Sequence, residues 1–445
     1  MSPYKSRSIF PSFRILAAYA ILTTFVLFFV FSGFHSQISD GLSRFANGIS
    51  SKFPDFSKYV ELENLSDEQF PLGDERKRVV LVGDIHGRYD ELQKLLRKIS
   101  YDPSADTLIS VGDIIAKGPH TGSMQVVRFM SSNNITAVRG NHDEKVIEWR
   151  TWLNWIRALP GGNDWLQLTK DKWLAYKERE RGESDVEEWV AKQMKEDKPN
   201  RKWWNKIPDG WQLFGDHYEI AAELTDDEYK YMVSRPLRIH VPSAHTFIVH
   251  AGVLASDPTR DPRDKRQPLA TVPKIPDFAE SSISDKILRK LQELAILSLV
   301  PQNLDPWVTL NMRGVKNGKV TRGKDGTPWS ELYNEDMHRC KGFSSRASTH
   351  KKNSLPCQPA TVIYGHAASR GLDIKRWTLG LDSGCVYQRR MTALVLGGKY
   401  ASKHFNEDEE ENEEDGVYDI EGKRVKSVID FGDDGKGKLF SVACN

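Results

Sequence analysis

This sequence of 445 residues has no large excess of either charge, few cysteines and only one long apolar run. The formal net charge is +2, which argues against a general nucleic-acid binder. Four cysteines are too few for a disulfide scaffold. Cys340 and Cys357 share one polar stretch and could pair in an oxidising compartment, with free thiols as the alternative. Charged residues make up 28% of the chain, which is typical of a globular body.

One segment, residues 15–34, is long, apolar and uncharged. Its length matches the roughly 20 residues that a helix needs to cross a bilayer. It follows a basic stretch that contains Lys5, Arg7 and Arg14. By the positive-inside rule, residues 1–14 stay cytosolic and the rest of the chain is translocated. We predict a transmembrane signal anchor at 15–34, with a cleaved signal peptide as the alternative.

Translocation agrees with two further features of the sequence. Residues 35–75 are polar and mixed in charge, and we interpret them as a stalk. Glycosylation sequons begin at Asn64 and Asn134, and Asn64 is the better candidate because it lies in this polar stretch. We therefore expect a glycoprotein with its main body at 76–445.

Five short polar motifs each follow an apolar, strand-like run. They read GDIHG at 83–87, GDII at 112–115, GNHD at 140–143, HAG at 250–252 and GHA at 365–367. Each motif places polar side chains at the C-terminal end of a strand, where open α/β sheets build their sites. Together they supply two Asp, one Asn and three His, namely Asp84, His86, Asp113, Asn141, His250 and His366.

This set of side chains fits a pair of divalent metal ions. Carboxylate and amide oxygens combined with imidazole suit Zn²⁺, Co²⁺, Mn²⁺ or Fe²⁺ better than Ca²⁺. Asp113 is the expected bridging ligand, since it lies between the other two early motifs. Two metals about 3.5–4 Å apart promote displacement at phosphorus, because water between them loses a proton near neutral pH and attacks. No Ser, Cys or Asp nucleophile is then needed.

Four further residues are candidates for direct contacts with a substrate. His142, beside Asn141, is the candidate general acid. Three basic residues are candidate phosphate contacts, namely Lys117, Arg139 and Arg313. A lone His is often a structural residue and a lone Arg a surface one, so these assignments depend on the metal ligands around them.

The order of the apolar runs predicts the architecture. Strands at 78–82, 107–111 and 135–138 alternate with helices, which predicts a largely parallel sheet with helices on its faces. Residues 148–240 are expected to be a helical cap whose many tryptophans pack inward, with a substrate-facing wall as the alternative. Residues 255–355 are expected to be loops with one helix near 282–299.

An acidic loop is expected at 403–417. Because 438–443 look like a last strand, the loop is interpreted as an insertion between strands and not as a tail. A solvated loop is the simple interpretation, and a regulatory plug over a basic site is the alternative.

These motifs resemble the calcineurin-like metallophosphoesterase superfamily, in its phosphoprotein-phosphatase-type branch, over residues 78–143, 245–255 and 360–397. The stretches GDIIAKGP, NMR and LDSGCVY are most similar to symmetrical diadenosine tetraphosphatases. A membrane anchor before such a body resembles the fungal vacuolar endopolyphosphatases, which work with zinc. The resemblance implies an α/β fold, a β-sandwich of two central mixed sheets flanked by helices, with one N-terminal transmembrane helix.

The resemblance also implies how the metal ions would be shared. One ion would be held by Asp84, His86 and Asp113. The other would be held by a second set that shares one carboxylate with the first, namely Asp113, Asn141, His250 and His366. Zn²⁺ is the ion that the resemblance favours.

Two positions depart from the protein-phosphatase pattern, because Ala116 and Lys117 stand where that pattern has Asp and Arg. The missing Asp would orient His142, and a lysine is a looser phosphate contact than a forked guanidinium. A weakly held acid matters less when the leaving group is a phosphate, whose pKa₂ is roughly 6, than when it is an alcohol. The departures therefore favour phosphoanhydride substrates.

We expect a metal-dependent hydrolase of inorganic polyphosphate, an endopolyphosphatase. It would be a single-pass type II protein of the vacuole membrane with a lumenal catalytic domain, and no sequence-specific nucleic-acid partner is expected. A hydrolase of dinucleoside polyphosphates or nucleotide caps is the nearest alternative. A Ser/Thr protein phosphatase is disfavoured by Ala116 and Lys117. A non-catalytic binding protein on a decayed fold is disfavoured by the intact ligand set.

Overall fold

The computed structural model describes residues 53–180, 185–274, 285–344, 354–398 and 416–445. The membrane anchor expected at 15–34 lies outside these residues, and so does the acidic loop expected at 403–417 except for its last two positions. Within the described ranges, no helix is both long and apolar enough to cross a bilayer.

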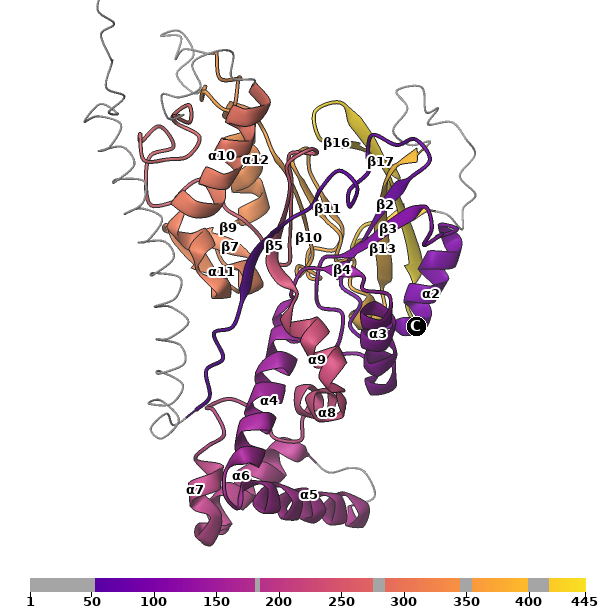
Figure 1. The fold of residues 1–445 in the computed structure, drawn as a ribbon, viewed down its shortest axis with the longest axis vertical. Helices are drawn as coiled ribbons and strands as arrows, with labels where there is room; N and C mark the ends of the chain where they lie inside the picture. Colours follow the sequence, from indigo (N-terminus) through magenta and orange to yellow (C-terminus); the bar gives the residue numbers. More distant parts are fainter. Residues whose placement is uncertain (1–52, 181–184, 275–284, 345–353, 399–415) are drawn as a thin grey trace, which may run out of the picture. The chain divides into compact units, whose positions relative to one another are not determined.

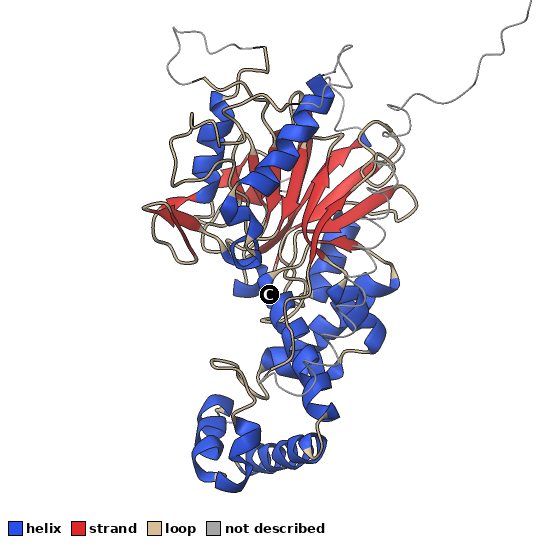
Figure 2. Ribbon diagram, turned by 60° about the vertical axis from the view of Figure 1, so that its left-hand side comes forward, coloured by secondary structure: helices blue, strands red, loops and turns tan. Residues whose placement is uncertain are grey.

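Two mixed sheets with helices around them form the centre of this body (Figures 1 and 2). The first sheet has the order β1 (Val60–Asn64), β5 (Pro236–Val241), β6 (Thr246–Val249), β10 (Thr361–Tyr364), β12 (Thr378–Gly380), β11 (Asp373–Ile374). The second has the order β16 (Val428–Phe431), β17 (Gly435–Ala443), β13 (Arg390–Gly397), β2 (Arg78–Val82), β3 (Asp106–Ser110), β4 (Thr136–Ala137). The body is therefore a mixed α/β fold.

The second sheet is less parallel than the sequence predicts. Strands β2, β3 and β4 are parallel, but β13 pairs antiparallel with β2, and β17 and β16 continue antiparallel. The alternation of strands and helices near the N-terminus correctly gives the parallel part. The antiparallel strands come from the C-terminal part of the chain. The residue pattern of β13 does not indicate that β2 is its partner or that the two strands run antiparallel.

Alternate side chains of the central strands enter two different apolar layers. Val79 and Leu81 of β2 pack between the two sheets together with Ile248 of β6 and Ile363 of β10. Val80 belongs to the cluster on the outer side of its sheet, under the helices. Because both faces are covered, these strands consist of uninterrupted apolar residues.

Helices cover the outer face of each sheet. Helices α2 (Tyr89–Lys98) and α3 (His120–Ser132) lie on the side of β2 and β3 (Figure 1). On the other side lie α10 (Asp285–Leu299), η2 (Pro301–Leu304), α11 (Pro306–Asn311), α12 (Trp329–Arg339) and a small sheet of β7 (Gly314–Lys316), β8 (Lys319–Thr321) and β9 (Thr327–Pro328). The helix expected near 282–299 is confirmed as α10, but the loops expected around it at 255–355 are wrong, because α12 there buries Trp329 and Tyr333.

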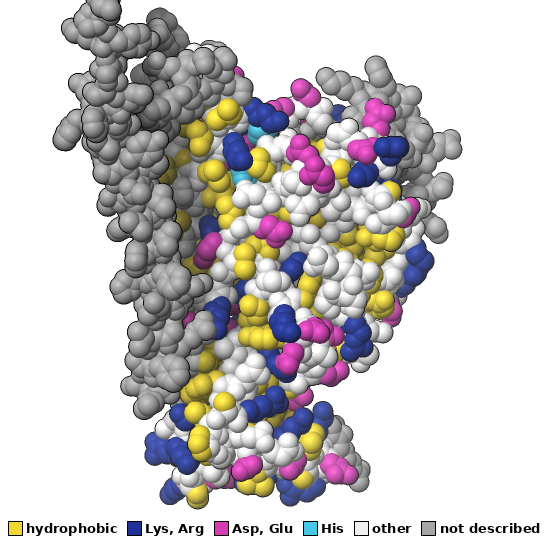
Figure 3. Space-filling model, in the orientation of Figure 1, with side chains coloured by type: hydrophobic (Ala, Val, Ile, Leu, Met, Phe, Trp, Pro, Cys, Tyr) yellow, Lys and Arg dark blue, Asp and Glu magenta, His cyan; other side chains and the backbone are white. Residues whose placement is uncertain are grey.

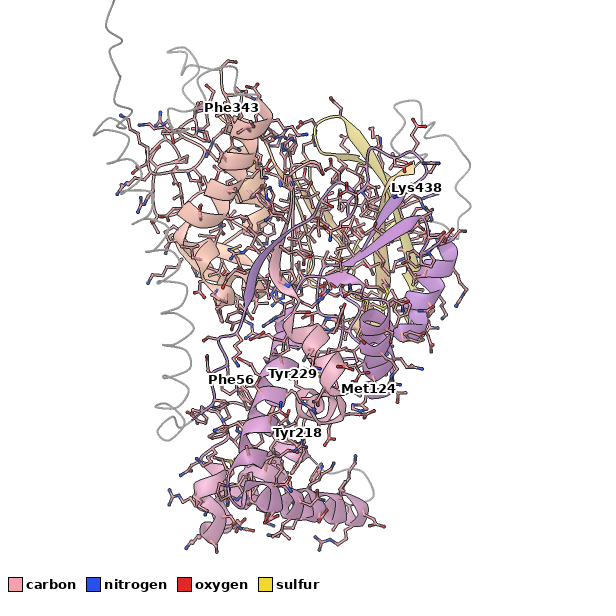
Figure 4. All side chains as sticks on the ribbon, viewed as in Figure 1. Phe56, Met124, Tyr218, Tyr229, Phe343 and Lys438 are labelled. Carbon is pink, nitrogen blue, oxygen red and sulfur yellow. A yellow bond between two sulfur atoms is a disulfide. The ribbon has the colours of Figure 1, made fainter. Side chains whose placement is uncertain are left out.

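A group of helices leads away from the sheets after β4. It comprises α4 (Asn141–Ala158), α5 (Gly162–Arg179), α6 (Val186–Glu196), η1 (Lys198–Asn200), α7 (Arg201–Trp204), α8 (Asp216–Glu223) and α9 (Asp226–Val233), which we call the cap. Its tryptophans pack inward, and Trp152 is fully buried. Tyr218 of α8 meets Trp149 of α4 edge-on, with ring centroids 5.2 Å apart (Figure 4). These aromatic contacts fix α8 against α4.

The stalk expected at 35–75 is wrong for its last part. Residues Val60–Asn64 form β1, which pairs in parallel with β5 at the edge of the first sheet. Leu65 and Phe70 are buried in the layer between the sheets. The polar composition is misleading because an edge strand buries few side chains. The sequon residue Asn64 thus lies at the end of a strand, where His240 contacts its amide oxygen.

All four cysteines form disulfides. Cys340 pairs with Cys357, the pairing that the sequence left open against free thiols. Cys385, in the short helix η3 (Cys385–Tyr387), pairs with Cys444, 59 positions later. The second bridge joins the loop between β12 and β13 to the residue after β17, beside the paired ends of β13 and β17. Among the remaining short elements, β14 (Val417–Tyr418) and β15 (Arg424–Val425) form a small ribbon.

Candidate metal centre

The five polar motifs meet at one edge of the two sheets. Asp84 follows β2, Asp113 follows β3, and Asn141 opens α4 after β4. His250 and His366 follow β6 and β10 of the other sheet. All six proposed metal ligands are buried, with His86 the most exposed at 6%. Side chains from both sheets therefore converge on one interior site.

The backbone around these side chains is held in a left-handed conformation at several non-glycine residues. His86 has a φ of 47°, Asp113 of 50° and His366 of 68°. Such values cost of order 1–3 kcal/mol each and cluster at functional sites. The motif glycines are needed for close approach, because a Cβ on Gly140 would lie 2.1 Å from the Asp113 nitrogen, and one on Gly365 would lie 2.0 Å from an Asp84 oxygen.

The ligand atoms form two overlapping groups. Atoms of Asp84, His86 and Asp113 lie within 4.8 Å of one another, and atoms of Asp113, His250 and His366 do the same. Oδ2 of Asp113 lies 3.7 Å from His86 Nε2 and 3.4 Å from His250 Nε2. Asp113 is therefore placed between the two groups, as a bridging ligand must be.

Backbone carbonyls determine which nitrogen of each histidine is free for a metal. Nδ1 of His86 lies 3.1 Å from the carbonyl of Ala116, and Nδ1 of His250 lies 2.9 Å from that of Val111. Nε2 of His366 lies 3.2 Å from the carbonyl of Asn311. A nitrogen can only donate to a carbonyl, so the opposite nitrogen of each neutral ring is a lone pair that faces the site.

Asn141 provides a test of whether a cation fits. Its Oδ1 lies 3.1 Å from His250 Nε2 and 2.9 Å from His366 Nδ1. Burial opposes protonation of His250, but Asp113 outweighs burial and raises the pKa of this ring to about 10, so a positive charge is favoured here. With neutral rings and their protons on the carbonyl side, all three atoms would present lone pairs to a cation in place of that proton, so the residues fit divalent metals.

Carboxylates crowd the same site. Burial raises the pKa of Asp84 well above its usual value, and the nearby charge of Asp382 raises it further. Burial also opposes ionisation of Asp113, but His250 and His142 outweigh burial and hold its pKa well below the usual value. Burial raises the pKa of Asp382 as well. A bound cation would relieve this concentration of buried negative charge.

Two acidic residues near the centre were missed by sequence reasoning as parts of the site. Asp143 accepts hydrogen bonds from the backbone N–H groups of Ile114 and Gly140, so it joins the second and third motifs. Asp382 follows β12 and accepts from the N–H of Gly384. Both lie inside recognised motifs, and the position of Asp382 directly after a strand is the signal that could have identified it.

His142 lies beside the metal ligands, with its ring centroid 5.4 Å from that of His86. Its backbone N–H donates to Asp113, and its Nδ1 lies 2.8 Å from Nε2 of His217. Burial lowers the pKa of His142 to about 3 and that of His217 to about 4. A multiply charged phosphate opposite His142 would favour its protonated form again. His217 is a partner that the sequence did not reveal.

The three predicted phosphate contacts have different positions. Lys117 is exposed beside the site, and Arg313 donates to the carbonyl of His366 at 3.2 Å. Arg139 is 1% exposed, pairs with Glu144 at 2.8 Å, and donates to two backbone carbonyls. The prediction for Arg139 is therefore wrong, because its guanidinium is engaged inside the protein and cannot meet a substrate.

A cavity of about 240 Å³ lies in the cap, between α4, the start of α8 and Lys117. Its wall contains two lysines and two tryptophans, and it includes the start of α8. The lining residues are Lys117, Lys145, Glu148, Trp149, Gly210, Trp211, Gln212, Gly215, Asp216 and His217. The cap thus both packs its aromatics inward and presents two of them to this cavity.

Residues 77–249 match the family model described as calcineurin-like phosphoesterase. A stretch of 65 residues is 49% identical to the symmetrical bis(5'-nucleosyl)-tetraphosphatase of Klebsiella pneumoniae (strain 342), covering 14% of this chain and 22% of the relative. A stretch of 89 residues is 39% identical to serine/threonine-protein phosphatase 1 of Salmonella typhimurium, covering 20% and 40%. The crystal structure of a candidate diadenosine tetraphosphatase overlaps 76% of this chain and 94% of that one, with 22% identity and a TM-score of 0.39.

The chain spans about a fifth of the tetraphosphatase relative and two fifths of the phosphatase relative. The family match at residues 77–249 contains the first three motifs of the metal centre and ends just before His250. Residues 77–249 of this chain therefore carry a calcineurin-like phosphoesterase domain. The family resemblance seen in the sequence is confirmed.

Proposed function

We propose that this protein is an endopolyphosphatase, a hydrolase that cleaves phosphoanhydride bonds of inorganic polyphosphate with two divalent metal ions, Zn²⁺ in the first place. The main observation that supports hydrolase activity is the pair of overlapping ligand groups that share Asp113. Ions bound there would polarise phosphoryl oxygens and lower the pKa of water. Asp84, His86 and Asp113 would hold one ion, and Asp113, Asn141, His250 and His366 the other.

The cations around the cavity support a polyanionic substrate. Burial lowers the pKa of Lys145, and the positive charges of Arg322 and Lys117 lower it further. Among the described residues, neither Lys117 nor Lys145 has an ion pair within 4 Å in the structure. On the face shown in Figure 3, basic and acidic side chains are interspersed over the cap, so its outer surface does not select an anion. The lysines in the cavity would bind the phosphates next to the one that reacts.

The second candidate function is hydrolysis of dinucleoside polyphosphates or nucleotide caps. One relative is named a bis(5'-nucleosyl)-tetraphosphatase. Trp149 and Trp211 line the same cavity, with ring centroids 4.6 Å apart, and a nucleobase can stack on such rings. Protein phosphatase activity is the third candidate, and Ala116 in place of an acid weakens it.

The substrate is tested with the full-length chain in detergent, loaded with Zn²⁺, Co²⁺, Mn²⁺ or Mg²⁺ in turn. Long-chain polyphosphate, diadenosine tetraphosphate and a phosphoserine peptide are compared, with Asn141→Ala as the inactive control. The proposal expects polyphosphate to shorten to mid-sized fragments. Turnover of the dinucleotide or the peptide alone would overturn the substrate assignment and leave the metallophosphoesterase intact.

We also propose the vacuole membrane as the location, with residues 15–34 as the anchor and the catalytic domain in the lumen. The two disulfides support an oxidising compartment on the side of the catalytic domain. The sequons at Asn64 and Asn134 agree with this side. A protease added to intact vacuoles should leave the domain uncut, and a glycosidase should increase its mobility on a gel. Digestion of the domain in intact vacuoles would contradict this topology.

A further inference from the structure

The cap supplies a second histidine to the candidate general acid. Nε2 of His217 lies 2.8 Å from Nδ1 of His142, and with centroids 5.1 Å apart and planes 15° apart the two rings lie nearly in one plane and meet edge to edge. The two residues are 75 positions apart, and both are largely buried. Ala116, at the end of the second motif, has no polar side chain to offer His142.

The start of α8 is held firmly enough to position this pair. Asp216, the residue before His217, accepts a 2.6 Å hydrogen bond from the backbone N–H of Lys117. Tyr218, the residue after it, packs edge-on against Trp149 of α4 (Figure 4). Three consecutive residues of α8 therefore contact Lys117 just after the second motif, His142 of the third motif and the long helix α4 of the cap.

We propose that His217 is a positioning residue for the hydrolysis, one that fixes the His142 ring so that Nε2 faces the departing oxygen. The proposal rests on the proposed function of His142 and not on the identity of the substrate. In the protonated His142, Nδ1–H donates to Nε2 of His217, and Nε2–H is given to the leaving oxygen as its bond to phosphorus breaks. His142 ends neutral and keeps its Nδ1–H bond to His217.

A purely structural role for His217 makes a different prediction. If His217 only docked the cap, its loss would slow all substrates by the same factor. If His217 orients the acid, its replacement should reduce the rate most for substrates whose leaving group needs a proton. General acids contribute about 10²–10⁴-fold to the rate for poor leaving groups. The leaving-group dependence therefore separates the two roles.

The test uses the full-length, metal-loaded chain and a series of aryl phosphates whose phenols differ in pKa. His217→Asn should slow phenyl phosphate by roughly 100-fold and 2,4-dinitrophenyl phosphate by less than about threefold. His217→Gln is the matched control, because its amide reaches the position of Nε2 whereas that of Asn does not. It should recover about tenfold or more of the loss on phenyl phosphate. Metal content and Tm should be equal in the two variants.

A double-mutant cycle with His142→Ala completes the test, on the aryl phosphates and on polyphosphate. In the His142→Ala background, His217→Asn should change kcat by less than about twofold, because a positioning residue has nothing left to position. Equal slowing of every ester, or an undiminished effect in this background, would overturn the role of His217. Normal activity of His142→Ala on phenyl phosphate, whose leaving group needs a proton, would instead overturn the proposed role of His142, so the two failures are distinguishable.

Discussion

At the scale of single residues, two basic side chains from neighbouring motifs have opposite roles. Arg139 is enclosed and paired with Glu144, whereas Lys117 is exposed at the cavity. Arg139→Ala should lower the free energy of unfolding by about 3–5 kcal/mol, since it leaves a buried carboxylate unpaired. The measurement is denaturant unfolding, with kcat and KM of the protein that remains folded. Unchanged stability together with a raised KM would restore Arg139 as a substrate contact.

Lys117→Ala is the matched comparison. Its removal should change stability by less than about 0.5 kcal/mol, as is usual for exposed positions. It should raise KM for polyphosphate by about 10–100-fold, because a hydrogen bond to a charged group contributes about 1.5–3 kcal/mol. A large loss of stability with an unchanged KM would contradict a contact between Lys117 and phosphate.

The bridging position of Asp113 can be tested by counting metal ions. Asp84 belongs to one ligand group, whereas Asp113 belongs to both. Asp84→Ala should therefore retain about one of the two ions expected for such a centre, and Asp113→Ala should retain neither. Elemental analysis after gel filtration gives the stoichiometry, with Glu331→Gln, at an exposed position of α12, as a control that keeps both ions. Equal losses in the two Ala variants would show that Asp113 does not bridge.

At the scale of elements, a buried carboxylate fastens α10 to the hairpin of β5 and β6. Glu293 accepts from His240 and His245 at 2.7 Å each. Burial opposes its ionisation, but these two bonds prevail and lower its pKa from the usual 4.5. A lowered folded-state pKa stabilises the protein above the unfolded value, and this stability is lost as the pH falls through the folded value.

Glu293→Gln should thus lower the free energy of unfolding by about 2–3 kcal/mol at pH 7, with a smaller difference below pH 4.5. Thermal unfolding from pH 3 to pH 7 measures it. Glu331→Gln, at an exposed position of α12, is the control and should follow the wild type at every pH. A difference that stays constant across this range would show that the ionised carboxylate is not the stabilising form.

Elements that are coded locally could be predicted from the sequence, and those that depend on distant partners could not. The apolar runs around β2, β3, β4, β6 and β10 are local patterns, and the residues that follow them gave all six proposed metal ligands. The pairing of β1 depends on β5, and the contact of His142 depends on α8. The direction of the Arg139 side chain is likewise set by burial against Glu144, which no spacing in the sequence specifies.

At the scale of the whole molecule, metal ligands from both sheets meet at a shared edge, and a disulfide fastens the loop that leads from one sheet to the other. The Cys385–Cys444 disulfide connects the loop after β12 with the end of β17. Cys340–Cys357 instead closes a loop of 17 positions within the outer layer beside α12. The first bridge restricts the unfolded chain more, because its loop is longer.

The loop-entropy relation gives about 4 kcal/mol for Cys385–Cys444 and about 3 kcal/mol for Cys340–Cys357. Paired Cys→Ser replacements, compared by thermal unfolding, should therefore show the larger loss for Cys385 and Cys444. Because Asp382 lies three residues before Cys385, the same replacement should also weaken metal retention, whereas replacing Cys340 and Cys357 should leave it unchanged. If the Cys340 and Cys357 replacement lost more metal, metal retention would depend on the outer layer beside α12 and not on the Cys385–Cys444 bridge.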